Sequence, residues 1–346
     1  MKVIRIIPKT NFHTYLHSDT LWGNLVYAYK LLYGETALEK LLENYLKGNP
    51  SFIVSSIFPY EIIKNDSEQI IYYFPKPLLG GETIEPESPE DMTMIKEFKA
   101  IKFVEQKIFE EYLNGNLNNK SLFERFKLFR IEENEKKEEQ DQNSIKYEKF
   151  RYLKDKDIKP IYNLHNSIDR MSGSTLEAEG RGQLYWEEEL AFRDKMGLFF
   201  LAEVTNLDEF TALLRLLSHV GIGGNRSIGK GSFKFEIEDF TLSIPSDSNA
   251  LITLSLYHPT EKELEIISKK EIKKFYDINI RIGAVGRDFN IEFQEKNPVP
   301  CFVEGSTFFV KDKLMGHLVS TAKMKDQKDI FSNYLFFGVK ANLRQS

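Results

Sequence analysis

The glycine-rich run GIGGNRSIGKG, from Gly221 to Gly231, constrains the fold of this chain more than any other stretch. Five of its eleven residues are glycine, whereas the whole chain of 346 residues contains 20. Glycine tolerates positive φ and carries no Cβ, so successive main-chain N–H groups of such a run can point toward one anion. Arg226 and Lys230 lie inside the run and could neutralise phosphates. The alternative reading is a flexible turn between a helix and a strand.

The elements on either side of the run limit what it can bind. Residues 207–220 place apolar side chains on one helical face, and residues 233–240 alternate apolar and charged side chains as a half-buried strand does. The run therefore joins the C-terminus of a helix to a strand. Phosphate-binding loops of nucleotide-binding proteins connect a strand to the N-terminus of a helix. This order disfavours a protein that binds a small nucleotide through the glycine-rich run.

The N-terminal region predicts a strand followed by a capped helix. Residues 1–8 alternate apolar and basic side chains up to Pro8, and Ser18 or Asp19 is a good N-cap for the helix that follows. Leu21, Leu25, Ala28 and Leu32 form its apolar stripe, and Gly34 is expected to end it. His13 and His17 precede this helix. They could serve in acid-base cleavage of RNA, but no second acid-base partner is evident, so contacts without chemistry are favoured. Tyr15 and Lys9 lie nearby in sequence, so the enzymatic alternative stays open.

Length and composition predict two folded domains. A chain of 346 residues with 41% hydrophobic content can build a core in each. The N-terminus lacks the features of a signal peptide and no run reaches the length of a membrane helix, so we expect a cytoplasmic protein. The single Cys301 excludes an internal disulfide and an all-cysteine metal site, and no metal or cofactor is predicted. A net charge of −5 argues against strong autonomous affinity for nucleic acid.

The rest of the chain divides into three stretches. Residues 51–61 and 69–78 are predicted to be strands, each broken by proline. Residues from about 91 to 154 are predicted to form a helical insertion. It would contain a helix over 94–115 and a solvated, mobile charged segment over 131–142. Residues 182–192 and 197–204 read as strands. A polar linker over 241–249 then leads to a smaller unit, with strands over 250–259, 279–286, 301–310 and 333–343 and a helix over 260–270.

Four motifs carry a resemblance to a known family. They are SDTLWG at 18–23, NSIDRMSGS at 166–174, GIGGNRSIGKGSF at 221–233 and, more weakly, VEGSTF at 303–308. In this order they resemble the RAMP superfamily, the RNA-binding subunits of CRISPR effector complexes. SDTLWG is similar to the SDTLFG-like signature of the Csm-type subunit of type III-A complexes that binds the crRNA 5′ handle, with Trp22 in place of the usual Phe.

The resemblance implies an α+β fold of two ferredoxin-like (RRM-like) domains, 1–240 and 250–346. The first would carry the helical insertion, a thumb hairpin at about 171–182 and the glycine-rich loop at 221–231. It also implies a non-catalytic subunit that caps the crRNA 5′ handle and docks to the large polymerase-like subunit and to the repeating backbone RAMP subunit. The alternative is a crRNA-processing endoribonuclease of the same superfamily that uses His13 or His17.

The resemblance also suggests roles for particular residues. Main-chain amides of the glycine run, with Arg226 and Lys230, would hold handle phosphates. Ser18, Thr20 and Asn24 would hydrogen-bond sugars or bases, and Arg170 would mark the point where handle gives way to guide. The full set of predicted RNA-binding residues is His17, Ser18, Thr20, Asn24, Arg170, Gly221, Gly223, Gly224, Asn225, Arg226, Ser227 and Lys230.

Overall fold

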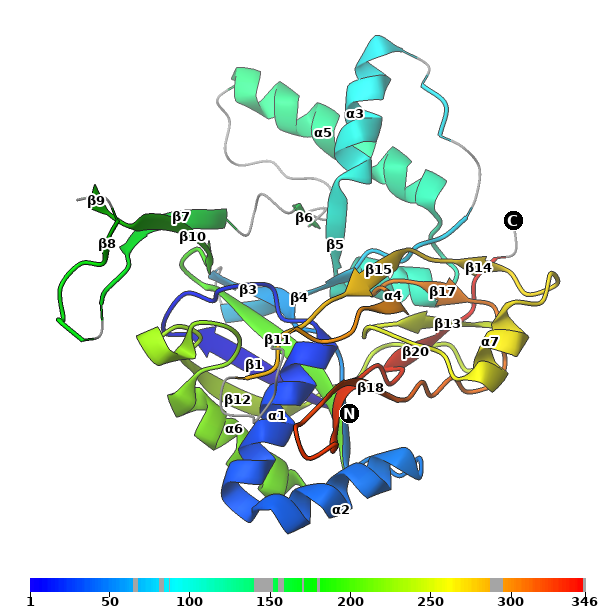
Figure 1. Ribbon diagram of the computed structural model, residues 1–346. Helices are drawn as coiled ribbons and strands as arrows, with labels where there is room; N and C mark the ends of the chain where they lie inside the picture. The colour runs from blue at the N-terminus through cyan, green and yellow to red at the C-terminus, as the bar shows by residue number, and fades with distance from the viewer. Residues whose placement is uncertain are drawn as a thin grey trace.

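A large antiparallel sheet forms the centre of the protein (Figure 1). The structure is a computed structural model that describes residues 1–64, 68–80, 84–86, 88–139, 152–154, 159–169, 171–178, 181–286 and 295–344. In spatial order the strands are β12 (Phe233–Asp239), β1 (Lys2–Pro8), β11 (Met196–Val204), β3 (Phe58–Lys64), β4 (Glu68–Pro75), β5 (Ile101–Glu105) and β6 (Tyr152–Lys154), and β2 (Phe52–Val54) also pairs with β11. Every pair is antiparallel.

Both faces of this sheet are buried, as the strand sequences require. Successive residues of a strand point to opposite faces, so Ile4 of β1 packs in one core and Val3 in another. The first core lies under α1 (Ser18–Tyr33), α2 (Glu35–Leu46) and α6 (Leu207–Val220). The second lies against α4 (Gln106–Leu113), α5 (Asn119–Glu139) and the C-terminal part. The continuous apolar run of β11 follows from burial on both sides.

The predicted strand and helix at the N-terminus are confirmed, with one correction. Helix α1 begins at Ser18, so its N-cap is His17, and that side chain makes no capping hydrogen bond. Ser18 and Asp19 are not caps because both have other partners across the molecule. Gly34 ends the helix with φ of +83° and is followed at once by α2, a helix that the sequence analysis did not predict.

The predicted helix over 94–115 is wrong. The segment holds α3 (Pro89–Lys99), then strand β5, then α4, because Ile101, Phe103 and Val104 extend the sheet beside β4. The insertion predicted at about 91–154 is therefore mixed rather than helical. Residues 131–139 of the charged segment continue helix α5, and residues 140–142 lie outside the described part. The predicted strand over 51–61 is two strands, β2 and β3, separated at Ser55–Ile57.

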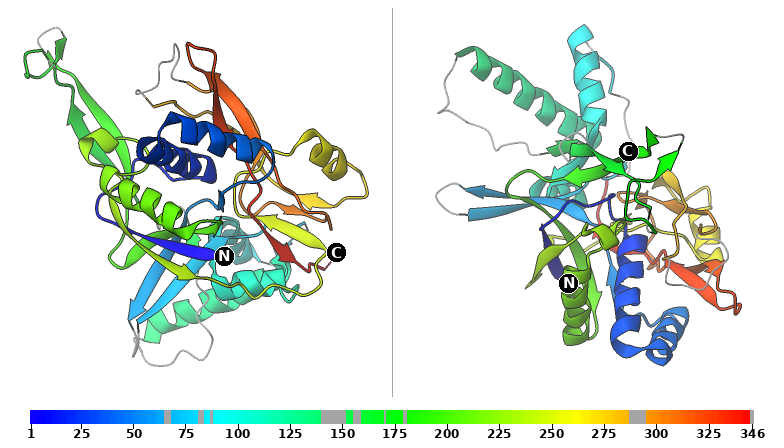
Figure 2. Two further views of the ribbon diagram at one scale, coloured as in Figure 1. Left: turned by 90° about the horizontal axis from the view of Figure 1, so that it is seen from below. Right: turned by 60° about the vertical axis from the view of Figure 1, so that its left-hand side comes forward.

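A long hairpin projects away from the sheet, as both Figure 1 and Figure 2 show. Its arms are β7 (Lys159–Asn166) and β10 (Leu184–Ala191), paired antiparallel, and a short pair, β8 (Glu177–Ala178) and β9 (Arg181–Gly182), lies at its far end. The predicted strands over 182–192 and 197–204 are confirmed as β10 and β11.

The C-terminal part shares a core with the central sheet. Phe337 and Val339 belong to the same apolar cluster as Val3 and Phe199. No strand or helix is assigned over 241–249, in accord with the predicted linker. The elements of this part are β13 (Ala250–Thr253), α7 (Glu261–Ile267), β14 (Lys274–Phe275), β15 (Ile278–Arg281), β16 (Val299–Phe302), β17 (Thr307–Phe308), β18 (Leu318–Lys323), β19 (Asp329–Asn333) and β20 (Gly338–Ala341).

Sheet order in the C-terminal part is β14-β17-β13-β20, with two further hairpins, β15–β16 and β18–β19. The strand predicted over 301–310 is interrupted at residues 303–306, which separate β16 from β17. Among the described residues, no helix has the length and apolar character needed to cross a membrane. Helix α7 begins at a capping box formed by Thr260 and Glu263.

Candidate nucleic-acid interface

The glycine loop, residues 221–231, lies against two segments that are distant in sequence. Its Gly231 N–H donates to the Asn11 carbonyl (3.0 Å), and the Lys9 N–H donates to the carbonyl of Ser232 (2.9 Å). The segment of residues 9–16 is fixed on its other side by two main-chain hydrogen bonds between Phe12 and Leu190 of β10. Loop, N-terminal segment and projecting hairpin therefore meet at one place on the molecule.

Glycine is required at several loop positions because the chain packs against itself there. At Gly231, with φ of +72°, a Cβ would lie 2.0 Å from the Ile222 carbonyl oxygen. At Gly221, with φ of +87°, it would lie 2.5 Å from the carbonyl oxygen of Lys230. A Cβ at Gly224 would meet the His13 ring at 2.5 Å. These close approaches exclude any larger residue without rearrangement. The run is therefore a closely packed loop and not a flexible turn.

The main-chain amides of the loop fall into two groups. Those of Gly221 and Ile222 donate inward, to the carbonyls of Leu217 (2.8 Å) and Gly231 (3.0 Å). Within the described residues, the amides of Gly223, Gly224 and Asn225 make no hydrogen bond. Asn225 adopts a left-handed conformation with φ of +60°, which leads into a single 3-10 turn over 226–228. The amides of Arg226 and Ser227 make none either, so the loop amides without a hydrogen-bond partner in this part of the structure are those of residues 223–227, and donors of this kind can bind an anion.

The two cations of the loop differ in their surroundings. The guanidinium of Arg226 lies over the Tyr27 ring of α1, 5.3 Å from its centroid, and its Nη1 is buried without a hydrogen-bond partner. The ammonium of Lys230 lies 2.5 Å from Oε1 of Glu189, a fully buried carboxylate. Burial alone would raise the pKa of Glu189, but Lys230, Asn11 and Asn163 hold it below its ordinary value. Lys230 is thus neutralised within the protein, whereas Arg226 is not.

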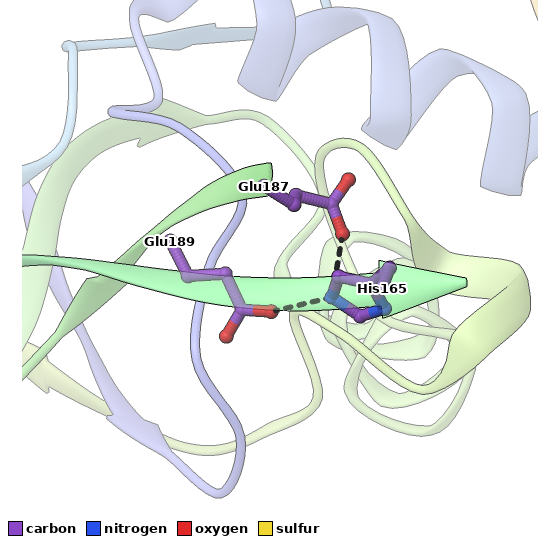
Figure 3. Close-up of side chains that lie close together, drawn as sticks. All are labelled: His165, Glu187 and Glu189. Atoms are coloured by element: carbon purple, nitrogen blue, oxygen red, sulfur yellow. Dashed lines mark ion pairs between the residues drawn. The ribbon is translucent and has the colours of Figure 1, made fainter. Parts of the chain in front are cut away.

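A cluster of ionisable side chains supports the loop from the hairpin. His165 Nε2 lies 3.3 Å from Glu187 Oε2 and 4.0 Å from Glu189 Oε1, as Figure 3 shows. Glu187 also accepts a hydrogen bond from the Asn225 side chain and lies 3.8 Å from His13 Nδ1. His165, Glu187 and Glu189 each offer one atom that could bind a metal ion, and these atoms lie within 4.8 Å of one another. The ammonium of Lys230 lies at the same carboxylate, so a metal ion would compete with it, and we assign none.

The hairpin has two chemically different faces. Residues opposite one another in an antiparallel pair share a face, so Glu187 and Asn163, and Tyr185 and His165, lie on the side of the glycine loop. The other face is exposed and largely apolar. It carries Tyr162 (60% exposed), Leu164, Leu184 and Trp186 (67% exposed). It also carries Glu188 and Asn166. The polar face positions the loop, and the apolar face is open to contact.

Residues of the SDTLWG motif lie elsewhere, at a contact between α1 and the C-terminal part that we call the seam. The buried hydroxyl of Ser18 accepts a hydrogen bond from the Leu256 amide (3.0 Å), and the Ser18 amide donates to the hydroxyl of Ser56 (2.9 Å). Asp19 forms an ion pair with Arg281 (3.1 Å). The Asn24 side chain donates to the carbonyl of Thr20 (2.7 Å). The motif joins the two halves of the chain.

The VEGSTF motif supplies the opposite side of the seam. His17 Nδ1 lies 2.8 Å from Oε1 of Glu304, which also accepts a hydrogen bond from the Ser56 hydroxyl. Burial alone would lower the pKa of His17, but the carboxylate of Glu304 outweighs that effect and raises it. Burial opposes ionisation of Glu304 too, yet His17 and Ser56 lower its pKa. Both groups are therefore stabilised in their charged forms.

The structure thus separates the predicted RNA-binding residues into two sets. The loop set is Gly221, Gly223, Gly224, Asn225, Arg226, Ser227 and Lys230, and the seam set is His17, Ser18, Thr20 and Asn24. Arg170 lies outside the described residues, as does part of the predicted thumb. His13 and His17 do not form a pair, because each faces a different carboxylate.

Sequence reasoning missed the residues that support the loop. They are Asn11, Tyr27, His165, Glu187 and Glu189. A signal was available, because Glu187 and Glu189 alternate along a strand and so share one face. An isolated pair of carboxylates on a strand does not identify its partners, which come from distant segments.

Comparison with known proteins finds a matching family profile and similar curated proteins. The profile of the RAMP superfamily matches residues 2–234. A protein of Methanocaldococcus jannaschii named CRISPR system Cms protein Csm4 is 29% identical over 94% of this chain and 90% of its own length. A Thermococcus onnurineus protein of the same name is 28% identical over 75% of each chain.

Two solved structures have a similar fold. A chain of the Csm3-Csm4 subcomplex in the type III-A CRISPR-Cas interference complex superposes with a TM-score of 0.60 at 22% identity, over 99% of this chain and 100% of that one. A chain of the Csm1-Csm4 cassette in complex with cA4 has a TM-score of 0.57 at 19% identity, over 100% and 99%. The likeness therefore extends over the whole chain, including the C-terminal part beyond the profile match.

Proposed function

The chain belongs to the RAMP superfamily, and we propose that it is a crRNA-binding subunit of a type III-A CRISPR (Csm) interference complex that caps the crRNA 5′ handle. The observation that carries this proposal is the meeting of three separated segments at the glycine loop, where the main-chain amides of residues 223–227 lack hydrogen-bond partners and Arg226 lacks an acidic partner within the described residues. Amides and a planar cation in one loop suit a phosphate of the RNA backbone.

The residues of the loop set have different roles in this proposal. The amides of Gly223, Gly224 and Asn225 take phosphate oxygens, and Arg226 supplies the positive charge because no acidic side chain among the described residues pairs with it, whereas Lys230 already pairs with Glu189. The exposed hydroxyl of Ser227 adds a hydrogen bond at the tip. Lys230 acts through Glu189, by fixing the loop against the hairpin. These contacts position RNA without reading its sequence.

The seam set has a structural role in this proposal. Ser18 is fully buried and both of its polar groups have partners within the protein. His17 is held by Glu304, and Asn24 by the helix itself. Thr20 contacts Asp19 and Arg281. We therefore assign these four residues to the joint between the two halves, and Arg170 keeps its predicted contact between handle and guide.

Two protein partners follow from the relatives. Both curated relatives are named Csm4, and the similar structures come from assemblies of Csm4 with Csm1 and with Csm3. We propose that this chain docks to the large subunit and to the backbone subunit of a cytoplasmic complex. A chain with a net charge of −5 would hold RNA weakly by itself, and its neighbours would supply further cations.

The finer description of the fold belongs to the same proposal. The order β12-β1-β11-β3, with α1 after β1 and α6 after β11, matches the arrangement expected of a ferredoxin-like domain within residues 1–240. Residues 250–346 form the second, smaller domain. The hairpin of β7 and β10 is the base of the thumb, with its tip at about 171–182.

We propose that the subunit does not cleave RNA. General acid-base catalysis needs two groups that reach one scissile phosphate. His13 faces Glu187 beside the loop, whereas His17 is engaged by Glu304 in the seam. The endoribonuclease alternative therefore depends on His13 alone, and cleavage of repeat RNA that disappears in His13→Ala would favour that alternative over this proposal.

The proposal is tested by the Arg226→Glu variant in a complex assembled with the large subunit, the backbone subunit and crRNA. Loss of one charge-assisted contact, about 1.5 to 3 kcal/mol, should reduce RNA retention by about tenfold or more. The matched control is Arg215→Glu, an exposed arginine of α6. Retention that is equal in both variants would contradict the proposal. Thermal unfolding checks that both variants stay folded, and Arg226→Glu should lower the unfolding temperature by at most a few degrees because it loses the contact with Tyr27.

A further inference from the structure

His13 is a polar side chain beside the glycine loop that the proposed function leaves without a role. Its ring lies against Gly224, where a Cβ would meet the ring carbon Cδ2 at 2.5 Å and Cγ at 3.1 Å. The φ of Gly224 lies outside the left-handed region, so glycine is needed there for space and not for backbone conformation. The missing Cβ therefore makes room for the imidazole beside the loop amides.

The main chain around His13 is fixed by the rest of the protein. Phe12, which is buried, exchanges two main-chain hydrogen bonds with Leu190 of β10, at 3.3 and 2.7 Å. The carbonyl of Asn11 accepts a hydrogen bond from the Gly231 amide of the loop, at 3.0 Å. The main chain that carries the imidazole is therefore ordered before any ligand arrives, which lowers the entropic cost of binding.

The two ring nitrogens of His13 differ in their surroundings. Nδ1 lies 3.4 Å from the amide nitrogen of the Asn225 side chain and 3.8 Å from Oε1 of Glu187. A side-chain NH₂ group only donates, so Nδ1 accepts in the contact with Asn225 and the proton of the neutral ring is on Nε2. Within the described residues Nε2 makes no hydrogen bond, and the side chain is 37% exposed. Nε2 is bonded to Cδ2, the ring atom nearest to Gly224, so this unused donor lies beside the loop.

We infer that His13 is a further phosphate contact of the glycine loop, in which Nε2–H donates to an oxygen of an RNA phosphate bound at the amides of residues 223–227. This inference rests on the proposed function. It adds a residue to the predicted RNA-binding set, which contains His17 but not His13. Nε2 carries a proton in both the neutral ring described above and the charged ring, so the contact needs no change of protonation.

Two other roles for His13 account for less of this geometry. A purely structural role explains the contact of Nδ1 with Asn225 and the packing of the ring against Gly224, but it leaves Nε2 without a function. A general base in RNA cleavage needs a ring nitrogen that is free to accept a proton. Here Nδ1 already accepts from Asn225 and Nε2 carries the proton, so a donor to phosphate is the role that the ring can fill.

The inference is tested by diethylpyrocarbonate labelling of the full chain with and without saturating crRNA 5′ handle. This reagent acylates accessible imidazole nitrogens, and mass spectrometry reads each histidine separately. RNA at about ten times its dissociation constant occupies about nine-tenths of the chain, so labelling of His13 should fall about fivefold or more. The matched control is His219, an exposed histidine in the last turn of α6 just before the loop. Its labelling should not change.

A second measurement is RNA retention in the complex assembled with the large subunit, the backbone subunit and crRNA. His13→Ala removes the donor and should reduce retention by about threefold to tenfold. His13→Gln keeps an N–H donor on a side chain of similar length and should lose less. His219→Ala should retain RNA as the unmodified chain does.

Each outcome decides the matter. Labelling of His13 that handle RNA leaves unchanged, or retention in His13→Ala equal to that of the unmodified chain, would overturn the inference. Equal protection of His13 and His219 would also overturn it, because it would show general shielding by RNA. The proposed function survives these outcomes as long as Arg226→Glu loses RNA. If Arg226→Glu and His13→Ala both retain RNA as the unmodified chain does, the proposed function fails as well. Cleavage of repeat RNA that disappears in His13→Ala would assign His13 to chemistry and overturn both.

Discussion

The glycine loop and the seam both contain residues that family resemblance assigns to RNA binding. Their polar groups differ in whether they have hydrogen-bond partners within the protein. In the seam, Ser18 and His17 have partners within the protein, and Ser18 is fully buried. In the loop, the amides of Gly223 and Gly224 and the Nη1 of Arg226 have none within the described residues. A shared signature therefore does not imply a shared role. One motif joins the two halves of the protein, and the other leaves main-chain donors without a partner among the described residues.

The largest effect is expected from Glu304→Gln. This change removes the carboxylate that balances His17 and leaves a partly buried imidazole without its counter-charge. Breaking a buried pair by removing one partner costs about 3 to 5 kcal/mol of unfolding free energy, which urea unfolding would measure. The control is Glu43→Gln, which breaks an exposed pair with Lys47 on α2 and should cost less than about 0.5 kcal/mol. Equal costs would show that the seam is not a joint.

The next effect is expected from Gly231→Ala. A residue with a Cβ at φ of +72° would contact the Ile222 carbonyl oxygen at 2.0 Å, so the loop must shift at a cost of about 2 to 3 kcal/mol. The control is Gly229→Ala, which has a similar φ of +87° but open space around it. It should cost about 1 kcal/mol. Thermal unfolding would compare the two, and indistinguishable values would contradict the packed loop described above.

Ser18 of the seam and Ser227 of the loop allow a direct comparison of the two regions, because both are predicted RNA contacts. Ser18→Ala leaves the Leu256 amide without its acceptor and should cost about 1 to 2 kcal/mol of stability while RNA retention stays unchanged. Ser227→Ala at the exposed tip should leave stability within about 0.5 kcal/mol. It should weaken RNA retention by about twofold to fivefold. If Ser18→Ala weakened RNA retention and Ser227→Ala lowered stability instead, the roles assigned to the seam and to the loop would have to be exchanged.

The smallest effect is a pH dependence confined to the seam. The raised pKa of His17 means that its stabilising contribution is fully present below the ordinary value of 6.5 and is lost as pH rises through the raised pKa. The lowered pKa of Glu304 means that its contribution is present above 4.5 and is lost as pH falls through the lowered pKa. The stability difference between the unmodified chain and Glu304→Gln should therefore be largest between pH 4.5 and 6.5 and smaller at pH 9. A difference independent of pH would exclude a charged pair.

Sequence patterns predicted the elements whose side chains repeat over a long enough stretch. The stripe of Leu21, Leu25 and Ala28 gave α1, and the apolar run of residues 197–204 gave β11. Strand β5 was missed because Ile101 and Val104 also fit a helical spacing, and only pairing with β4 separates the two possibilities. Local patterns contain no information on such a pairing.

The candidate site could be predicted in part for the same reason. Five glycines in eleven residues identified the loop from composition alone. The engagement of Lys230 by Glu189, and of Ser18 by Leu256, depends on contacts between residues 41 and 238 positions apart. Family resemblance could not supply these contacts, because a motif that joins two halves of a chain and one that binds RNA can be equally recognisable.

The most direct test of the account is amide hydrogen exchange of the full chain with and without saturating crRNA 5′ handle. Open amides that bind phosphate should exchange more slowly once RNA is present, so slowing is predicted at residues 223–227. Residues 18–24 should not change, because they lie within helix α1 and their side chains are engaged in the seam. Slowing at 18–24 with none at 223–227 would contradict the account.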